Sequence, residues 1–348
     1  MELSPECIER LSRKGVDPKI LAKILASLDN AQTPSQLSGF ESDKPGDSLP
    51  LQGSDSQAAG GPEAASAQDS TTRISRSQLF DLLSTMSERD KQILAALYKY
   101  RFLFTNQIQR LYFTEAKDKR SNTINANRML KKLKEQGLIA PLKRRSLGYR
   151  SGSVSLIWHL TSAGYRLLNL MDADKYPRKS FDEPSTMFLA HTLAIAETAV
   201  QLSTICTASG DISLKNADPE PSCWRPFKDN GRQVFLKPDL YAVTVTDYGH
   251  GDRYEDSWFI EMDLGTEAPT QVVEKCQAYL RYYNTGTEQE KKGVFPVVVW
   301  LVKDEARKQK LRQYIRESLP PQPKMFLVIT PDQLGKMVRN FIESEELC

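Results

Sequence analysis

Three carboxylates in the C-terminal half of the sequence lie at the ends of two apolar, β-branched runs. Asp239 opens the run Leu240–Thr246, and Glu261 and Asp263 close a second run about twenty residues later. If the two runs are adjacent strands, the carboxylates meet at one point, and oxygen ligands of this kind suit hard cations such as Mg²⁺ or Mn²⁺. A metal ion held in this way can activate water against a phosphodiester. The spacing therefore predicts a metal site at Asp239, Glu261 and Asp263.

The runs around these carboxylates predict an α/β domain over residues 183–348. A nearly all-apolar helix comes first, and three strands, a helix and a further strand follow it. The predicted elements are the helix Met187–Ile205; strands at Ile212–Leu214 or Val234–Leu236, at Leu240–Thr246 and at Trp258–Met262; the helix Pro269–Tyr283; the strand Val294–Val302; the helix Glu305–Ser318; the strand Met325–Ile329; and a final helix. Asp239 therefore starts the second strand, where a preceding proline is tolerated because its missing N–H lies outside the ladder.

Two further charged residues are candidates for the same site. Glu197 lies in the first helix on a stripe with Leu193, where a carboxylate is costly unless it is paired, hydrated or metal-bound. Lys275 lies four residues before Tyr279 in the next helix, so both side chains point the same way. The competing interpretations are a salt bridge for Glu197 and a plain surface position for Lys275. His191, near the start of the first helix, is assigned no role.

Positive charge is concentrated in one segment of the chain. Residues 86–170 hold 17 Lys and Arg against 5 Asp and Glu, a net charge of +12, whereas the whole 348-residue chain carries +3 and the remainder therefore −9. Such asymmetry indicates a module that binds a polyanion, joined to a part with another task.

The basic segment also has the pattern of a winged helix-turn-helix domain, which is predicted over residues 77–172. Its elements are a helix capped at Ser87, a short helix after Thr105, a helix from Ser121 to Gln136, strands at Leu138–Arg144 and Val154–Leu160 with a basic turn between them, and a helix that starts at Thr161. Serine and threonine before an apolar periodic run are typical N-caps, and Gly137 is a typical helix end.

The third of these helices presents a face that suits DNA. At about 100° per residue, Ala126, Leu130 and Leu133 share an inward face. Polar and basic residues share another face and continue on the turn: Asn122, Asn125, Arg128, Lys131 and Lys132 on the helix, and Lys143, Arg144, Arg145 and Arg150 on the turn. Asn and Arg suit base edges and Lys suits phosphate, so these residues are predicted to bind double-stranded DNA. A helix-turn-helix that binds only proteins is the alternative.

The remaining sequence predicts no other folded core. A narrow apolar stripe in residues 4–28 predicts a short helical element over 1–28 that docks on a protein partner, and residues 29–75 have the composition of a disordered linker. There is no signal-peptide pattern and no run of about 18 apolar residues, which predicts no membrane segment. The five cysteines are scattered and form no CxxC pair, which predicts a reducing, cytoplasmic setting without zinc.

The element order and the carboxylates resemble the PD-(D/E)xK nuclease superfamily. Pro238 and Asp239 match the first motif, and Glu261 matches the acidic position of the second, but Asp263 occupies the position of the lysine. That lysine positions or activates the attacking water. Because relocated lysines occur in the superfamily, Lys275 is the candidate replacement.

This resemblance implies an α/β multidomain protein, a winged helix-turn-helix followed by a PD-(D/E)xK nuclease-like αβββαβ domain. It implies Asp239, Glu261 and Lys275 as catalytic residues. It also implies Mg²⁺ or Mn²⁺ held by Glu197, Asp239, Glu261 and Asp263, with room for two metal ions.

A narrower resemblance is to the plasmid replication-relaxation family, over roughly residues 86–318. It rests on the basic winged helix, the helical stretch His191–Glu197, the Pro238-Asp239 pair, the stretch Glu261–Glu267, and Lys275 four residues before Tyr279. That family is associated with mobile elements and implicated in plasmid replication and DNA relaxation. The resemblance therefore implies a DNA-processing protein of a plasmid or other mobile element.

Three functions are compatible with these patterns. In the first, the winged helix holds duplex DNA and the second domain nicks or cuts it with Mg²⁺ or Mn²⁺. In the second, the chain is a non-catalytic replication initiator or transcriptional regulator with a degenerate nuclease fold, which Asp263 at the lysine position favours. In the third, residues 4–28 recruit replication or transposition proteins to a scaffold. No oligomeric state is predicted.

Overall fold

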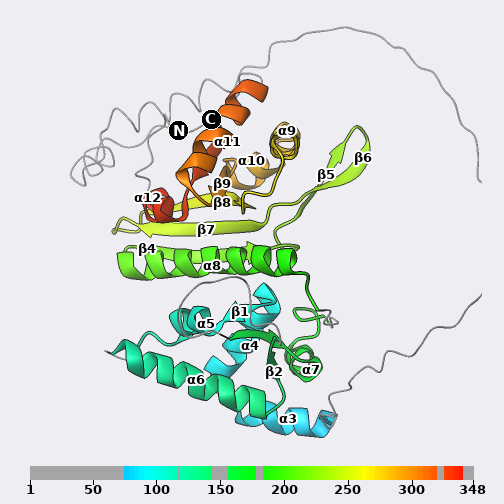
Figure 1. Cartoon of the computed structure of the whole chain (residues 1–348), viewed down its shortest axis with the longest axis vertical. Coiled ribbons are helices and arrows are strands. Elements are labelled where there is room, and N and C mark those ends of the chain that lie inside the picture. The colour runs from blue at the N-terminus through cyan, green and yellow to red at the C-terminus, as the bar shows by residue number, and fades with distance from the viewer. Residues whose placement is uncertain (1–73, 116–117, 143–155, 178–182, 320–324, 340–348) are drawn as a thin grey trace, which may run out of the picture. The chain divides into compact units, whose positions relative to one another are not determined.

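The computed structural model describes residues 74–115, 118–142, 156–177, 183–319 and 325–339, whose course Figure 1 shows. The expected docking element over 1–28 lies outside these residues, as does nearly all of the expected linker. The basic turn with Lys143, Arg144, Arg145 and Arg150 also lies outside them. All described residues belong to one structural unit, residues 73–348.

The N-terminal part of this unit is helical and carries a small antiparallel sheet. The helices are α3 (Arg76–Thr85), α4 (Glu88–Tyr100), α5 (Thr105–Tyr112), α6 (Lys119–Glu135) and α7 (Ser162–Met171), and the strands are β1 (Leu103–Phe104), β2 (Ile139–Pro141) and β3 (Ile157–Leu160) in the order β1-β3-β2. The predicted caps are confirmed: the hydroxyls of Ser87 and Thr161 accept hydrogen bonds from the first turns of α4 and α7. Gly137 follows α6 with a φ of 69°, a conformation that glycine adopts at little cost.

The predicted inward face of α6 is confirmed. Ala126, Leu130 and Leu133 are fully buried and pack in one core with residues of α4 and α7 such as Leu94 and Leu168. Burial of a leucine side chain stabilises a fold by about 1.5–3 kcal/mol, so this stripe fixes the rotation of α6 about its axis. The opposite face of α6 is therefore directed to solvent.

The C-terminal part is built on a mixed five-stranded sheet with the order β10-β9-β8-β7-β4. Its strands are β4 (Ile212–Pro219), β7 (Leu240–Asp247), β8 (Arg253–Asp263), β9 (Val297–Val302) and β10 (Phe326–Ile329). The strands β4, β7 and β8 pair antiparallel, whereas β8, β9 and β10 pair parallel. The predicted strands are confirmed here, with the candidate carboxylates at adjoining ends of β7 and β8.

Helices cover both faces of this sheet. The helices are α8 (Thr186–Ser209), α9 (Pro269–Tyr283), α10 (Thr287–Lys292), α11 (Glu305–Ser318) and α12 (Leu334–Val338), with a short 3₁₀ helix at Pro331–Gln333. In Figure 1, α8 runs along one face, and α9 and α11 lie beyond the other. The core on the α9 side contains Phe259 and Trp300, and the core on the α8 side contains Ile260 and Leu301. This alternation along β8 and β9 sends neighbouring side chains to opposite faces.

The helix α8 buries apolar residues on two sides, because the sheet covers one side and the N-terminal part covers another. Ala199 and Leu202 pack in the sheet core, whereas Leu189 and Leu193 pack against Phe102 and Ile157 of the N-terminal part. None of the helices in the described ranges combines the length and the apolar character that crossing a bilayer requires.

The two alternative positions for the first strand are both strands, in different sheets. Ile212–Leu214 begins β4 of the main sheet. Val234–Leu236 belongs to β6 (Arg232–Leu236), which pairs only with β5 (Arg225–Asp229) in a separate hairpin. The hairpin turn, Asn230-Gly231, has positive φ at both residues, the arrangement that a tight two-residue β-turn requires.

Candidate active site

Asp239 and Glu261 lie opposite each other on neighbouring strands. Leu240 of β7 pairs with Ile260 of β8 in antiparallel register, so the residue before Leu240 faces the residue after Ile260. Both carboxylates are buried, Asp239 at 7% and Glu261 at 1% exposure. Two buried acids side by side are costly unless other groups compensate their charge.

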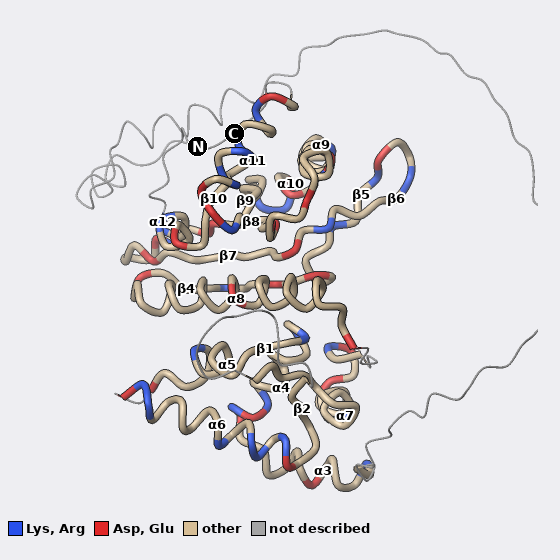
Figure 2. The backbone as a smooth tube through the Cα atoms, in the orientation of Figure 1, with Lys and Arg blue, Asp and Glu red and all other residues tan. Residues whose placement is uncertain are grey.

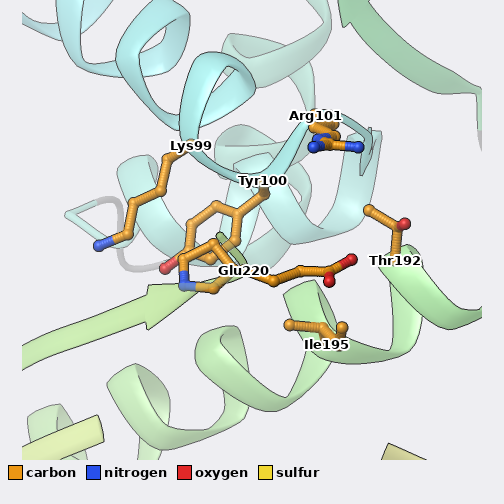
Figure 3. Close-up of a pocket in the computed structure, with 7 residues that line it drawn as sticks. Lys99, Tyr100, Arg101, Thr192, Ile195 and Glu220 are labelled. Atoms are coloured by element: carbon orange, nitrogen blue, oxygen red, sulfur yellow. The ribbon is translucent and has the colours of Figure 1, made fainter. Parts of the chain in front are cut away.

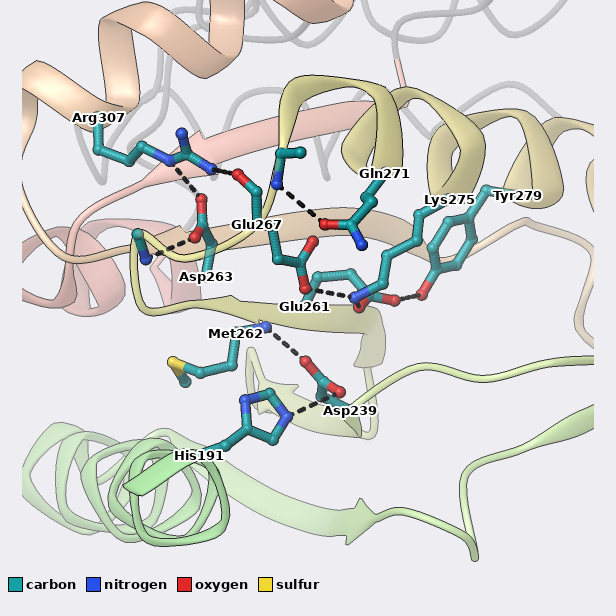
Figure 4. Close-up of polar contacts among 12 residues, drawn as sticks. His191, Asp239, Glu261, Met262, Asp263, Glu267, Gln271, Lys275, Tyr279 and Arg307 are labelled. Carbon is teal, nitrogen blue, oxygen red and sulfur yellow. Dashed lines mark hydrogen bonds and ion pairs between the residues drawn. The ribbon is translucent and has the colours of Figure 1, made fainter. Parts of the chain in front are cut away.

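The compensating groups for Glu261 come from α9, as Figure 4 shows. The hydroxyl of Tyr279 donates a hydrogen bond of 2.5 Å to Oε1, and Nζ of Lys275 lies 3.1 Å from Oε2. Burial, followed by the charge of Asp239, raises the pKa of Glu261 to about 8, although Lys275 and Tyr279 oppose the shift. Burial and the charge of Asp239 therefore favour the protonated form of Glu261.

Lys275 is the cation of the group. Its Nζ atom also lies 2.8 Å from Oε1 of Glu267. Burial alone would lower the pKa of Lys275, but the charges of Glu261 and Asp239 outweigh it and raise the pKa above its ordinary value. The side chain is therefore a fixed ammonium group between two carboxylates. Lys275 and Tyr279 do point the same way from one helix, and both reach Glu261.

Asp239 is held from two other elements. The backbone N–H of Met262 donates to Oδ2 over 2.7 Å, and Nε2 of His191, on α8, lies 3.1 Å from Oδ1. The hydrogen bond to Asp239 raises the pKa of His191, against the effect of burial. His191, which sequence reasoning left without a role, is thus a direct partner of the candidate ligand.

Asp263 is engaged elsewhere, although it lies on the same strand as Glu261. Nε of Arg307 lies 2.6 Å from Oδ2 of Asp263, and the backbone N–H of Gly265 donates to Oδ1 over 2.6 Å. Arg307 also donates to the carbonyl oxygen of Glu267 over 2.8 Å. In Figure 4, Asp263 lies on the side of Arg307 rather than beside Asp239. Asp263 therefore anchors α11 and the loop after β8.

Glu197 points toward the N-terminal part of the unit. Its carboxylate lies 2.5 Å from Nη1 of Arg110 and 2.9 Å from Nε2 of Gln107, both on α5. It stands six residues after His191 on α8, a rise of about 9 Å along the helix axis. The structure therefore does not bring Glu197 to the Asp239–Glu261 pair, and its partner is a cation.

The structure brings together two carboxylates and not the four that were expected to hold two metal ions. Within the described ranges, no group of three or more His, Cys, Asp or Glu residues is arranged to hold a metal ion. Mg²⁺, however, commonly takes only one or two carboxylates, keeps several waters and adds substrate phosphates. Asp239 and Glu261 supply two carboxylates, although each of their four oxygens already has a protein partner. The expected additional ligands, Glu197 and Asp263, are paired with arginines instead.

A small pocket lies between α4, α8 and the end of β4, as Figure 3 shows. It is lined by Lys99, Tyr100, Arg101, Thr192, Ile195, Pro219 and Glu220. The backbone N–H of Glu220 donates to the carbonyl oxygen of Asp239 over 3.1 Å, but neither Asp239 nor Glu261 lines the pocket. Arg101 has a φ of 64°, which is unusual for a residue other than glycine.

The exposed face of α6 carries part of the predicted DNA-binding set. Asn125, Arg128 and Lys131 are exposed, and Figure 2 shows basic positions along this helix. Lys132 is partly engaged, because its Nζ lies 2.8 Å from Oδ2 of the buried Asp90. Asn122 is only 8% exposed, so its side chain lies toward the interior.

The family comparison agrees with these observations. Residues 94–298 match the family described as Replication-relaxation, a span that runs from α4 through both strands of the carboxylate pair into β9. The chain belongs to the Replication-relaxation family. The resemblance found in the sequence is thus confirmed, and the family region includes His191, Asp239, Glu261 and Lys275. No curated protein and no solved structure matches the chain.

Several residues of this network had no role in the sequence prediction: His191 and Arg307, and also Gln107, Arg110 and Glu267. His191 had one signal, since it is an ionisable side chain near the start of an otherwise apolar helix. Arg307 had none, because it is one of many charges in α11 and only the fold brings it to Asp263, 44 residues earlier.

Proposed function

We propose that this Replication-relaxation family member is a metal-dependent DNA-processing protein, of a plasmid or other mobile element, that nicks or cuts DNA at the Asp239–Glu261–Lys275 group. The observation that carries the proposal is the buried carboxylate pair with an ammonium group 3.1 Å from one member. Paired acids with a compensating lysine are costly in a purely structural core, and they suit phosphodiester hydrolysis.

The order of helices and strands in the C-terminal part supports a nuclease-like fold. The series α8, β4, β7, β8, α9, β9 follows the αβββαβ order of PD-(D/E)xK nucleases, with the β5–β6 hairpin inserted after β4. Asp239 stands where the first motif of that superfamily stands, and Glu261 occupies the acidic position of the second. Lys275 reaches Glu261 from α9, which supports a relocated lysine in place of the one that Asp263 replaces.

The N-terminal part supports a winged-helix fold, because its elements follow the order α4, β1, α5, α6, β2, β3, α7 with an antiparallel sheet β1-β3-β2. In this arrangement α6 is the helix that would lie in a DNA major groove. Its exposed Asn125, Arg128 and Lys131 supply side chains for base edges and phosphates.

The chemistry assigned to the site divides between its residues. In hydrolysis, a water oxygen bonds to phosphorus and loses a proton to solvent. The bond from phosphorus to a bridging oxygen breaks, that oxygen takes a proton from solvent, and negative charge grows on the phosphoryl oxygens in between. The ammonium group of Lys275 would stabilise this charge, and Glu267 and Glu261 hold that group in place. His191 keeps the Oδ1 side of Asp239 oriented. Mg²⁺ or Mn²⁺, held by Asp239 and Glu261, would supply an activated water and offset the charge of the phosphate.

The test is a nicking assay on supercoiled plasmid with Mg²⁺ or Mn²⁺. The wild-type chain is expected to produce open circles, and Asp239→Asn and Lys275→Met are expected to slow this by about a hundredfold or more. Glu274→Gln is the matched control, because Glu274 is exposed on α9 beside Lys275. Nicking by Asp239→Asn at the wild-type rate would contradict the assignment.

A second function, a non-catalytic DNA-binding initiator or regulator, is favoured by one observation. All four carboxylate oxygens of Asp239 and Glu261 already have protein partners: His191, Met262, Tyr279 and Lys275. In that case the group would only hold β7, β8 and α9 together. The chain would then bind DNA equally well with EDTA and with Mg²⁺, and the wild-type chain would leave the plasmid intact under every metal condition.

A further inference from the structure

The β5–β6 hairpin connects the end of β4 to Asp239, and its two faces differ in character. Register pairs Arg225 with Leu236, Pro226 with Phe235, Phe227 with Val234, and Lys228 with Gln233. Because directly opposite residues of an antiparallel pair share a face, these pairs alternate between the two sides of the hairpin. In Figure 1 the hairpin extends away from the main sheet.

One face of the hairpin packs on the body of the protein. Phe227 is buried and its ring lies 5.3 Å from that of Tyr282, on α9. Arg225 pairs with Glu288 over 2.8 Å, and at the tip Asp229 pairs with Arg281 over 3.0 Å. These contacts fix the hairpin relative to α9 and α10 and turn its other face outward.

The outward face alternates aromatic and cationic residues. Phe235 is 49% exposed, and Lys228 and Lys237 are exposed as well. Trp224 is half-buried and packs partly against the core. Nζ of Lys237 lies 4.7 Å from the centre of its ring, which lies 6.5 Å from the ring of Phe235. Asp229 is the only acidic residue between positions 225 and 237, and it is paired with Arg281. The face is therefore positive and aromatic.

We propose that this outward face, Trp224, Lys228, Phe235 and Lys237, binds single-stranded DNA and leads it to the Asp239–Glu261 pair, an inference that rests on the proposed function. Two features connect the face to the site. Lys237 stands two residues before Asp239 in the chain. The thiol of Cys223, beside Trp224, donates to the carbonyl oxygen of Pro238, which ties the start of the hairpin to the start of β7.

Single-stranded DNA fits this face better than duplex DNA does. An exposed aromatic ring next to lysines can stack on an unpaired base while the lysines contact the flanking phosphates. In a duplex the base faces are already stacked on one another, so Phe235 would gain nothing from it. The substrate class predicted for the site is therefore DNA with an unpaired strand, such as a melted or branched region.

The test measures binding and not cleavage. Fluorescence anisotropy with the full chain in EDTA compares a labelled oligothymidylate of about 16 nucleotides with a duplex of the same length. Phe235→Ala is expected to weaken binding of the single strand about tenfold and to leave duplex binding unchanged. Lys237→Ala is expected to lower the salt slope of single-strand binding by about 0.7.

Tyr254→Ala is the matched control, because Tyr254 is also a strand aromatic with 49% exposure but lies at the far end of β8. It is expected to bind the single strand as the wild type does. Three outcomes for Phe235→Ala would each overturn the proposal. The variant could keep the wild-type affinity for the single strand, lose as much affinity for the duplex as for the single strand, or lose more affinity for an oligouridylate than for the oligothymidylate. Failure of the nicking assay would leave these binding results in place, so the two proposals are tested separately.

Discussion

The hydroxyl of Tyr279 lies 2.5 Å from Oε1 of Glu261, although the first residue comes from α9 and the second from β8. Both side chains are 1% exposed, so this contact is made without competing solvent. Together with Lys275, one turn earlier on α9, it ties the helix to the carboxylate pair at the centre of the sheet. The stability of the fold and the chemistry of the site are therefore linked at Glu261.

The stability of the protein is expected to fall as the pH rises from about 4.5 to about 8. The folded-state pKa of Glu261, about 8, lies above its ordinary value of 4.5, so over this range the folded chain keeps a proton that the unfolded chain has released. This contribution is fully present below 4.5 and is lost as the pH rises through about 8. The raised pKa of His191 acts in the same direction above 6.5.

Urea unfolding in EDTA at several pH values checks this prediction. Glu261→Gln should flatten the pH dependence, whereas the exposed Glu274→Gln should reproduce the wild-type curve. Parallel curves for the wild type and Glu261→Gln would show that Glu261 is not the group responsible.

Tyr279→Phe is expected to destabilise the fold by about 1–3 kcal/mol, because it leaves a buried carboxylate without one of its donors. The loss should be largest at alkaline pH, where Glu261 is charged. Chemical denaturation at pH values below and above the pKa of Glu261 measures both effects. Tyr254→Phe, at a half-exposed position, serves as the control, and an equal loss in both variants would argue against the hydrogen bond as the cause.

Mn²⁺ or Mg²⁺ is expected to raise the thermal midpoint of the wild-type chain. A ligand at about a hundred times its Kd stabilises the folded state by about 2.7 kcal/mol. Asp239→Asn should lose this response, because the variant removes one of the two carboxylates that the cation needs. Differential scanning fluorimetry with and without EDTA measures the shift. The same shift in Asp239→Asn would place the ion elsewhere.

Glu197→Gln tests whether Glu197 acts as an ion-pair partner or as a metal ligand. The structure pairs Glu197 with Arg110, and both side chains are about one-third exposed. Loss of this pair should therefore cost roughly 1 kcal/mol or less. A double-mutant cycle with Arg110→Ala measures the coupling. The response to Mn²⁺ should remain that of the wild type, and a weakened response would restore Glu197 to the ligand set.

Arg128→Ala and Lys131→Ala are expected to weaken binding to duplex DNA. Each phosphate contact that is lost should lower the slope of log affinity against log salt by about 0.9. Lys310→Ala, on the charged helix α11, is the control and should leave the slope unchanged. Electrophoretic or anisotropy titrations at several salt concentrations measure it. Equal slopes in all variants would remove α6 from the DNA interface.

Local patterns were sufficient to predict most elements of the sheet domain. The bounds predicted for α9 and α11 agree with the structure, because a Pro269 start and an apolar periodicity are local signals. Val234–Leu236 of β6 was one of the two alternatives for the first strand. Its partner β5 was missed, since β5 contains a proline and mixes charges with apolar residues. Pairing with β6, rather than its own composition, makes β5 a strand.

The sequence by itself determined the family, the inward face of α6 and the two strands that carry Asp239 and Glu261, because these depend on residue types at short spacing. The tertiary structure alone decided the partners of each carboxylate. Glu197 and Asp263 were expected as additional metal ligands beside Glu261, yet Arg110 and Arg307 engage them. His191 joined Asp239 instead. A charge takes the partner that packing brings within a few ångströms, and in this fold those partners come from other elements.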